Sequence, residues 1–266
     1  MSANVDIMRE GPLGLVRMHR GGLNAIAADL TDELAEVFTA LGADPDIRCV
    51  VLASDSDRAF SVGADLTGMA AIDRSSPDAH AQVLAFLGHV HRGYQAISAC
   101  PKPVLAAIGG HALGGGCELA LCCDYRVMVD DGHAQIGQTE SALGIIPGAG
   151  GTQRLVRLIG KARALPLLLE ARRLTAPEAQ AIALVDLIAP PEAFERTWRG
   201  LAGRLAAGPT RAFALIKDAV NRGQGLPLPE ALALEADHFA TAALTDDAAI
   251  GIMSFLAKQT PEFTGS

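Results

Sequence analysis

The 266-residue sequence has few aromatic residues and lacks an excess of basic ones. Phe, Trp and Tyr make up only 4% of the residues although half are hydrophobic, so the interior must consist mainly of Ala, Val, Ile and Leu. Such an interior is common in helix-rich α/β proteins. A formal charge of −8 argues against general nucleic-acid binding, because neutralising phosphates requires a basic surface. We therefore expect no nucleic-acid partner.

Long apolar runs, a leader-like start and paired cysteines are also missing. No apolar run reaches membrane-spanning length, and the first residues lack the basic and apolar blocks of a signal peptide. The five cysteines lie mostly in apolar surroundings, without the spacing of a metal site or a secreted scaffold. We predict a cytoplasmic protein with no membrane partner and with reduced core cysteines.

Several motifs that would indicate other chemistries are absent. The sequence contains no Gly-x-Gly-x-x-Gly after a strand, no phosphate-binding loop, no His-Glu-x-x-His and no Gly-x-Ser-x-Gly. His89 and His91 are separated by one residue, but such residues point apart on a helix. The seven histidines form no cluster, so we predict no metal.

Strands and helices alternate along most of the chain. Apolar patterns predict strands at 5–8, 13–19, 49–53, 103–108 and near 125–129. Helical spacing of Leu30, Leu34, Val37, Phe38 and Leu41 predicts one helix, and residues 81–99 predict another. This order favours parallel strands with crossovers.

The remaining segments predict loops and a helical end. Residues 59–66 have no clear period and are expected to form a loop, followed by a mobile connection at 68–80. From residue 151 onward the pattern is almost wholly helical. We predict a mixed core at 1–195 and a C-terminal helical region at 196–266.

A run of three glycines combines two kinds of chemistry. Gly114, Gly115 and Gly116 stand where a helix is expected to begin, so their backbone N–H groups could face a negative charge. Glu118 follows one helical turn later, and Glu140 comes from another segment. Acid/base catalysis and oxyanion stabilisation are both available to this constellation. The simpler alternative is that the glycines let a helix pack closely against a neighbour.

Four segments carry a family resemblance: Ala59-Phe60-Ser61-Val62-Gly63-Ala64-Asp65-Leu66, the stretch 110–120 around Gly-Gly-Gly-Cys-Glu, Gly137-Gln138-Thr139-Glu140, and 144–155. In this order they resemble the crotonase superfamily, and most closely the enoyl-CoA hydratases. The resemblance implies an α/β fold, a spiral of ββα units with a helical C-terminal region, assembled as homotrimers or homohexamers. It also implies an acyl-CoA thioester substrate and no separate cofactor.

The resemblance assigns the catalytic roles residue by residue. The N–H groups of Ala64 and Gly115 would form an oxyanion hole for the enolate. Glu118 would activate water and Glu140 would deliver a proton to the α-carbon, so we expect burial or the neighbouring charge to raise at least one pKa. Gly148 matches a glycine whose N–H holds the catalytic water or a glutamate.

Further matches imply contacts with the substrate. Asp65, Leu66 and Thr67 match the segment that passes the coenzyme arm, although Asp65 could instead cap a turn. Arg58 and Lys258 are candidates for the coenzyme phosphates, with solvated surface charges as the alternative. Thr139 and Ser141 depart from the family's usual Pro-Glu-Ile or Pro-Glu-Val around Glu140.

Three functions remain to be distinguished. Hydration of a trans-2-enoyl-CoA to the 3-hydroxyacyl-CoA is the leading hypothesis. An enoyl-CoA isomerase is the nearest alternative, but its Glu118 position is usually not acidic. A noncatalytic or RNA-binding relative is the third, and the acidic charge and glutamate pair argue against it.

Overall fold

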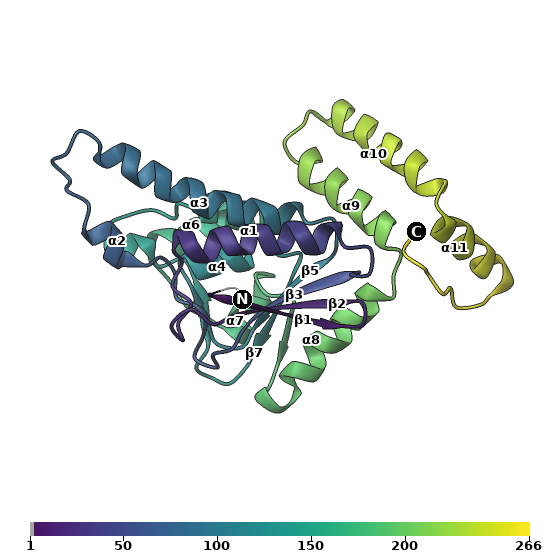
Figure 1. Ribbon diagram of the computed structural model, residues 1–266, viewed down its shortest axis with the longest axis horizontal. Helices are drawn as coiled ribbons and strands as arrows, with labels where there is room; N and C mark the ends of the chain where they lie inside the picture. The colour runs from purple at the N-terminus through teal and green to yellow at the C-terminus, as the bar shows by residue number, and fades with distance from the viewer. Residues whose placement is uncertain (1–2) are drawn as a thin grey trace.

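The computed structural model describes residues 3–266, which contain two β-sheets surrounded by helices (Figure 1). The six-stranded sheet consists, in spatial order, of β1 (Val5–Glu10), β2 (Leu13–Met18), β3 (Cys49–Ser54), β5 (Val104–Ile108), β7 (Tyr125–Val129) and β10 (Leu187–Ala189). The four-stranded sheet consists of β4 (Ala59–Ser61), β6 (His111–Leu113), β8 (Gln135–Gly137) and β9 (Leu174–Thr175).

Helices occupy most of the remaining chain. They are α1 (Ala28–Ala43), α2 (Leu66–Ala70), α3 (Ala79–Ala99), α4 (Gly115–Ala120), the short 3-10 helix η1 (Glu140–Leu143), α5 (Gly151–Ile159), α6 (Lys161–Leu169), α7 (Ala176–Ala181), α8 (Pro191–Ala206), α9 (Thr210–Gly223), α10 (Leu228–Ala243) and α11 (Asp246–Ala257).

The chain repeats one supersecondary unit. β3 and β4 precede α2 and α3, β5 and β6 precede α4, and β7 and β8 precede η1 and α5. In each unit the first strand joins the six-stranded sheet and the second joins the four-stranded sheet. The neighbours β4, β6 and β8 run parallel, so their carboxyl ends meet at one edge. This arrangement confirms the expected spiral of ββα units.

Alternating side chains divide the core into two layers. On β3, Val50 and Leu52 face the larger cluster that includes α1, while Val51 faces a second cluster that includes Trp198 of α8. All five apolar residues that predicted the first helix are buried on α1. α1 and α3 pack together on one side of the sheet (Figure 1). The five cysteines are free and buried, as expected for core thiols.

The structure corrects two of the expectations on secondary structure. Residues 59–61 form β4 and α2 begins at Leu66, so the expected loop contains only 62–65 and α2 extends into the expected connection. The segment after Gly151 also contains β9 and β10. Strands of two or three residues are too short to show a period, and they form because a partner strand supplies their hydrogen bonds, as β7 does for β10.

The C-terminal helices leave the core. The expected boundary at residue 195 falls inside α8, which still covers the six-stranded sheet, whereas α9, α10 and α11 lie to one side (Figure 1). Within residues 3–266, no single helix is long and apolar enough to cross a membrane. The bent pair α10 and α11 reaches that length and hydropathy only when the two helices are taken together.

Candidate active site

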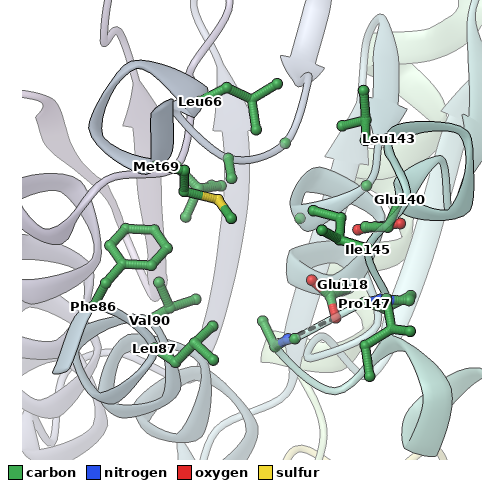
Figure 2. Close-up of a pocket in the computed structure, with 18 of the residues that line it drawn as sticks. Leu66, Met69, Phe86, Leu87, Val90, Glu118, Glu140, Leu143, Ile145 and Pro147 are labelled. Atoms are coloured by element: carbon green, nitrogen blue, oxygen red, sulfur yellow. Dashed lines mark hydrogen bonds between the residues drawn. The ribbon is translucent and has the colours of Figure 1, made fainter. Parts of the chain in front are cut away.

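A cavity of about 670 Å³ lies at the edge where β4, β6 and β8 end. One wall comes from α2 and α3, and the opposite wall from η1 and the loop before α5 (Figure 2). The residues that line it include two carboxylic acids, Glu118 and Glu140, and no Asp, His, Lys or Arg. A mostly apolar cleft with a few polar groups is the usual form of a small-molecule site.

Two backbone N–H groups approach each other in this cavity. Ala64 follows β4, and Gly115 is the first residue of α4, after β6. A Cβ placed on Gly115 would lie only 3.6 Å from the Ala64 nitrogen. Within residues 3–266 neither N–H donates a hydrogen bond, so both are free to bind an oxygen atom of a ligand. An oxyanion hole is built from two such neighbouring, unpartnered donors.

Gly63 makes this close approach sterically feasible. Its φ is +98°, a left-handed conformation that glycine adopts without strain. A Cβ there would lie 3.1 Å from the Leu113 carbonyl oxygen and 3.3 Å from the Gly115 nitrogen. A larger residue would therefore push the two N–H donors apart.

Glu118 is buried on α4 and held by the start of α5. Its side chain is 3% exposed, and its Oε1 accepts hydrogen bonds from the N–H groups of Ala149 at 2.8 Å and Gly151 at 2.7 Å. Both bonds go to one oxygen (Figure 2), and within residues 3–266 no hydrogen bond reaches Oε2. The carboxylate is thereby fixed while one oxygen stays available to the cavity.

Glu140 begins η1 and faces the same cavity (Figure 2). It is 9% exposed, and a Cβ on Gly114 would lie 3.1 Å from its Oε1. In the amide orientation that satisfies both groups, the nitrogen of the buried Gln138 donates to the two carboxylate oxygens at 3.3 and 3.2 Å. Gln138 is a contact that the sequence analysis did not identify.

The environments of the two glutamates raise both pKa values. Burial raises the pKa of Glu140 to about 7, and the negative charge of Glu118 adds to the increase. Burial also raises the pKa of Glu118, while the N–H groups of Gly151 and Ala149 oppose that increase. These shifts confirm the expected raised pKa and make the pair suited to proton transfer near neutral pH.

Tyr94 of α3 anchors the residue that carries the Gly115 donor. Its hydroxyl is fully buried and donates to the Gly115 carbonyl oxygen at 2.6 Å. Burial raises the pKa of the Tyr94 hydroxyl well above its ordinary value, and the charge of Glu118 adds to the effect. The side chain therefore acts as a neutral hydrogen-bond donor. No motif pointed to this contact, which joins two separate helices.

Gly148 lines the cavity, but the N–H groups that hold Glu118 belong to Ala149 and Gly151. The Gly148 carbonyl oxygen lies 2.7 Å from Nε2 of His91. α5 begins at Gly151, three residues after Gly148. A backbone N–H carries no sequence signature, so only the fold could identify these donors.

The remaining candidates occupy different places. Leu66 lines the cavity, whereas the Asp65 carboxylate caps α2 by accepting from the Thr67 N–H at 3.1 Å. That contact lowers the pKa of Asp65. Arg58 lines a separate cavity beside His111. Lys258 directly follows α11, a helix that lies on the side of the molecule away from α2 (Figure 1).

Similarity to proteins of named function extends over almost the whole chain. A family profile described as enoyl-CoA hydratase/isomerase matches residues 9–266. The crotonyl-CoA hydratase of Syntrophomonas wolfei is 36% identical over 261 residues, covering 98% of this chain and 97% of that protein. The short-chain-enoyl-CoA hydratase of Clostridium acetobutylicum is 33% identical over 257 residues, covering 96% and 95%.

Solved structures give the same result. The crystal structure of an enoyl-CoA hydratase from Bacillus anthracis superposes with a TM-score of 0.90 at 33% identity, covering 99% of this chain and 100% of that one. The agreement extends over both sheets and the C-terminal helices. The chain therefore belongs to the enoyl-CoA hydratase/isomerase family of the crotonase superfamily.

Proposed function

We propose that this protein hydrates trans-2-enoyl-CoA thioesters to 3-hydroxyacyl-CoA. The single observation that carries the proposal is the pairing of two buried glutamates, Glu118 and Glu140, beside two unpartnered N–H donors in one cavity. Hydration requires both an acid/base pair and an acceptor for the charge that develops on the thioester oxygen. The names of the relatives support the same reaction.

In the proposed reaction, the thioester oxygen accepts from the N–H groups of Ala64 and Gly115. Glu118 takes a proton from water through its free oxygen as the water oxygen bonds to the β-carbon. The π electrons move to the thioester oxygen and form an enolate, which the two N–H groups stabilise. When the carbonyl reforms, the α-carbon receives a proton from Glu140, whose pKa of about 7 allows proton donation near neutral pH. A proton then returns from Glu118 to Glu140 through a water molecule and restores both groups. The substrate has gained one molecule of water, so the reaction needs no separate cofactor.

An isomerase would need only one acid/base group to carry a proton between two carbons. The specific observation against it is the backbone support of Glu118, whose Oε1 accepts two N–H groups at 2.8 and 2.7 Å. A carboxylate held so firmly beside the cavity supports a role in orienting water. An RNA-binding role lacks a comparable feature, because the cavity contains no Arg or Lys.

Loss of the conjugated thioester absorbance of crotonyl-CoA tests the proposal. Wild type should hydrate it, and Glu118→Gln and Glu140→Gln should each lose about 10²–10⁴-fold in kcat. The matched control is Glu36→Gln, which changes an exposed glutamate of α1 and should retain full activity. Inertness of wild type toward enoyl-CoAs of every chain length would exclude a hydratase. Faster reaction of 3-enoyl substrates, with only the Glu140 variant inactive, would favour the isomerase.

We also propose that the protein is a homotrimer or a pair of trimers in the cytoplasm. α10, α11 and the turn between them expose large apolar side chains. Among these are Phe239, Leu244, Phe255 and Leu256, with 74%, 88%, 82% and 70% of their surfaces exposed. A patch of this kind is typical of a protein interface. The five free, buried thiols support a reducing compartment.

A further inference from the structure

The wall that α3 contributes to the cavity is apolar along its length. Val83, Phe86, Leu87, Val90 and Tyr94 line the cavity at helical spacing, so they form one stripe on α3. Val90 and Tyr94 are buried, but Val83, Phe86 and Leu87 are only partly covered. The first half of α3 therefore presents apolar surface that no other part of the described chain covers completely.

The opposite wall is also apolar and only partly covered. Leu143, Ile145 and Ile146 line the cavity with 56%, 37% and 76% of their surfaces exposed. Figure 2 shows Leu143 and Ile145 on the side of the cleft opposite Phe86 and Met69. Two facing apolar walls gain stability when an apolar group displaces the water between them.

One end of the cleft is closed by contact between its walls. A Cβ on Gly148 would lie 3.0 Å from Cδ2 of Leu87, so Leu87 already packs against the loop there. The His91 ring also lies 2.7 Å from the Gly148 carbonyl oxygen. The apolar space therefore lies along α3 toward its N-terminal end, beside Val83 and Phe86.

The polar groups of the cavity limit what this space can accept. Its acidic groups are Glu118 and Glu140, and the Tyr94 hydroxyl is used by the Gly115 carbonyl. No Arg or Lys among the lining residues could pair with a carboxylate on the acyl chain. The lining thus favours a chain that is apolar along its whole length.

We propose that the preferred substrates are medium-chain 2-enoyl-CoAs with an apolar acyl chain rather than crotonyl-CoA, with the chain lying between the α3 stripe and the Leu143–Ile146 wall. This inference rests on the proposed function. A crotonyl group has a single methyl beyond its double bond and leaves both walls largely exposed to water. Each further methylene buried there contributes to binding of the reacting substrate.

Chain-length kinetics test the inference directly. The kcat/KM for hydration should rise by roughly fourfold per methylene until the cleft is full. The value for trans-2-octenoyl-CoA should therefore exceed that for crotonyl-CoA by at least about tenfold. An equal or lower value for the octenoyl substrate would overturn the inference.

Variants on two neighbouring residues of α3 locate the chain. Val83→Trp should fill the cleft and lower the kcat/KM for octenoyl-CoA by a much larger factor than the kcat/KM for crotonyl-CoA, whose acyl group does not reach Val83. The matched control is Leu84→Trp, because Leu84 is 54% exposed and does not line the cavity. Val83→Phe provides a smaller change if the Trp variant does not fold. Equal losses for both substrates in the Val83 variants would overturn the inference.

Binding of saturated thioesters separates this inference from the proposed reaction. By calorimetry, wild type should bind octanoyl-CoA at least about tenfold more tightly than butyryl-CoA, and Val83→Trp should reduce that ratio. Equal affinities would overturn the chain-length inference even if crotonyl-CoA is hydrated. If octanoyl-CoA binds more tightly but no enoyl-CoA is hydrated, the proposed function fails and the chain-length inference stands.

Discussion

At the scale of single residues, Glu140 couples the proposed chemistry to stability. Folding raises its pKa from 4.5 to about 7, mainly by burial. The folded protein therefore holds this proton more tightly than the unfolded chain does, and the contribution of Glu140 to stability falls as the pH rises from 4.5 to 7.

Glu140→Gln should remove this pH dependence. Above pH 7 the wild type carries a charge that its environment disfavours, whereas Gln stays neutral, so the variant should have the higher Tm. Near pH 5 the wild-type side chain is mostly protonated and the difference should be smaller. Thermal unfolding of both proteins at pH 5.5 and 8.5 measures the effect. A Tm difference that is the same at both pH values would contradict the prediction.

Tyr94 offers a second prediction on a single hydrogen bond. Tyr94→Phe removes the hydroxyl that donates to the buried Gly115 carbonyl oxygen and should cost about 0.5–1.5 kcal/mol of unfolding free energy. The only other tyrosine, Tyr125, is 36% exposed, so Tyr125→Phe is a matched control that should change stability by less than about 0.5 kcal/mol. Urea unfolding followed by circular dichroism compares them, and equal effects would contradict the assigned contact.

At the scale of elements, the glycine run combines an open backbone N–H with close helix packing. Gly115 leaves its N–H open to the cavity, whereas Gly116 lets α4 pack directly on β4. A Cβ on Gly116 would lie 2.1 Å from the Ser61 carbonyl oxygen, far inside contact distance. The proposed oxyanion donor and the residue that allows close packing are therefore adjacent on one helix.

Gly116→Ala should accordingly separate α4 from β4. We expect a loss of about 1–3 kcal/mol or more, because backbone atoms on both sides must move. Gly68→Ala in α2 is the matched control, since nothing lies within 4 Å of the added Cβ. The control should be neutral or stabilise by up to about 1 kcal/mol. If Gly116→Ala and Gly68→Ala change the Tm equally, the close contact between α4 and β4 does not contribute to stability.

Ser141 explains how the loop of Glu140 is fixed despite its unusual sequence. Its hydroxyl donates to the Leu168 carbonyl oxygen at 2.8 Å, which ties η1 to the end of α6. The residue that departs from the expected Ile or Val after Glu140 therefore anchors η1 through its hydroxyl.

At the scale of the whole molecule, the apolar surface of α10 and α11 predicts self-association. Phe255→Asp should place a charge in the proposed interface and reduce the native mass from a multiple of three chains to a single chain. Ala40→Asp, at an exposed position of α1, is the matched control. Sedimentation equilibrium distinguishes the states, and a wild-type protein that is monomeric would exclude the trimer.

Sequence alone determined the family, the order of the longer helices and strands, and the two glutamates proposed as the acid/base pair. Long motifs are local in the chain, so Glu118, Glu140, Ala64 and Gly115 could be named without coordinates. The sequence also predicted α1 correctly, because its buried residues recur at helical spacing from Leu30 to Leu41. Short strands such as β4 and β10 were not, because they depend on partners distant in sequence.

Tertiary structure alone decided what surrounds those residues. The N–H groups of Ala149 and Gly151 belong to the backbone, so residue type does not reveal them. The Tyr94 hydroxyl contacts a residue 21 positions away, on another helix. The first half of α3 has no recognisable motif, yet the fold turns its apolar stripe toward the catalytic pair. Chemistry is encoded by residue type along the chain, whereas the donors and the substrate pocket arise only where separate elements meet.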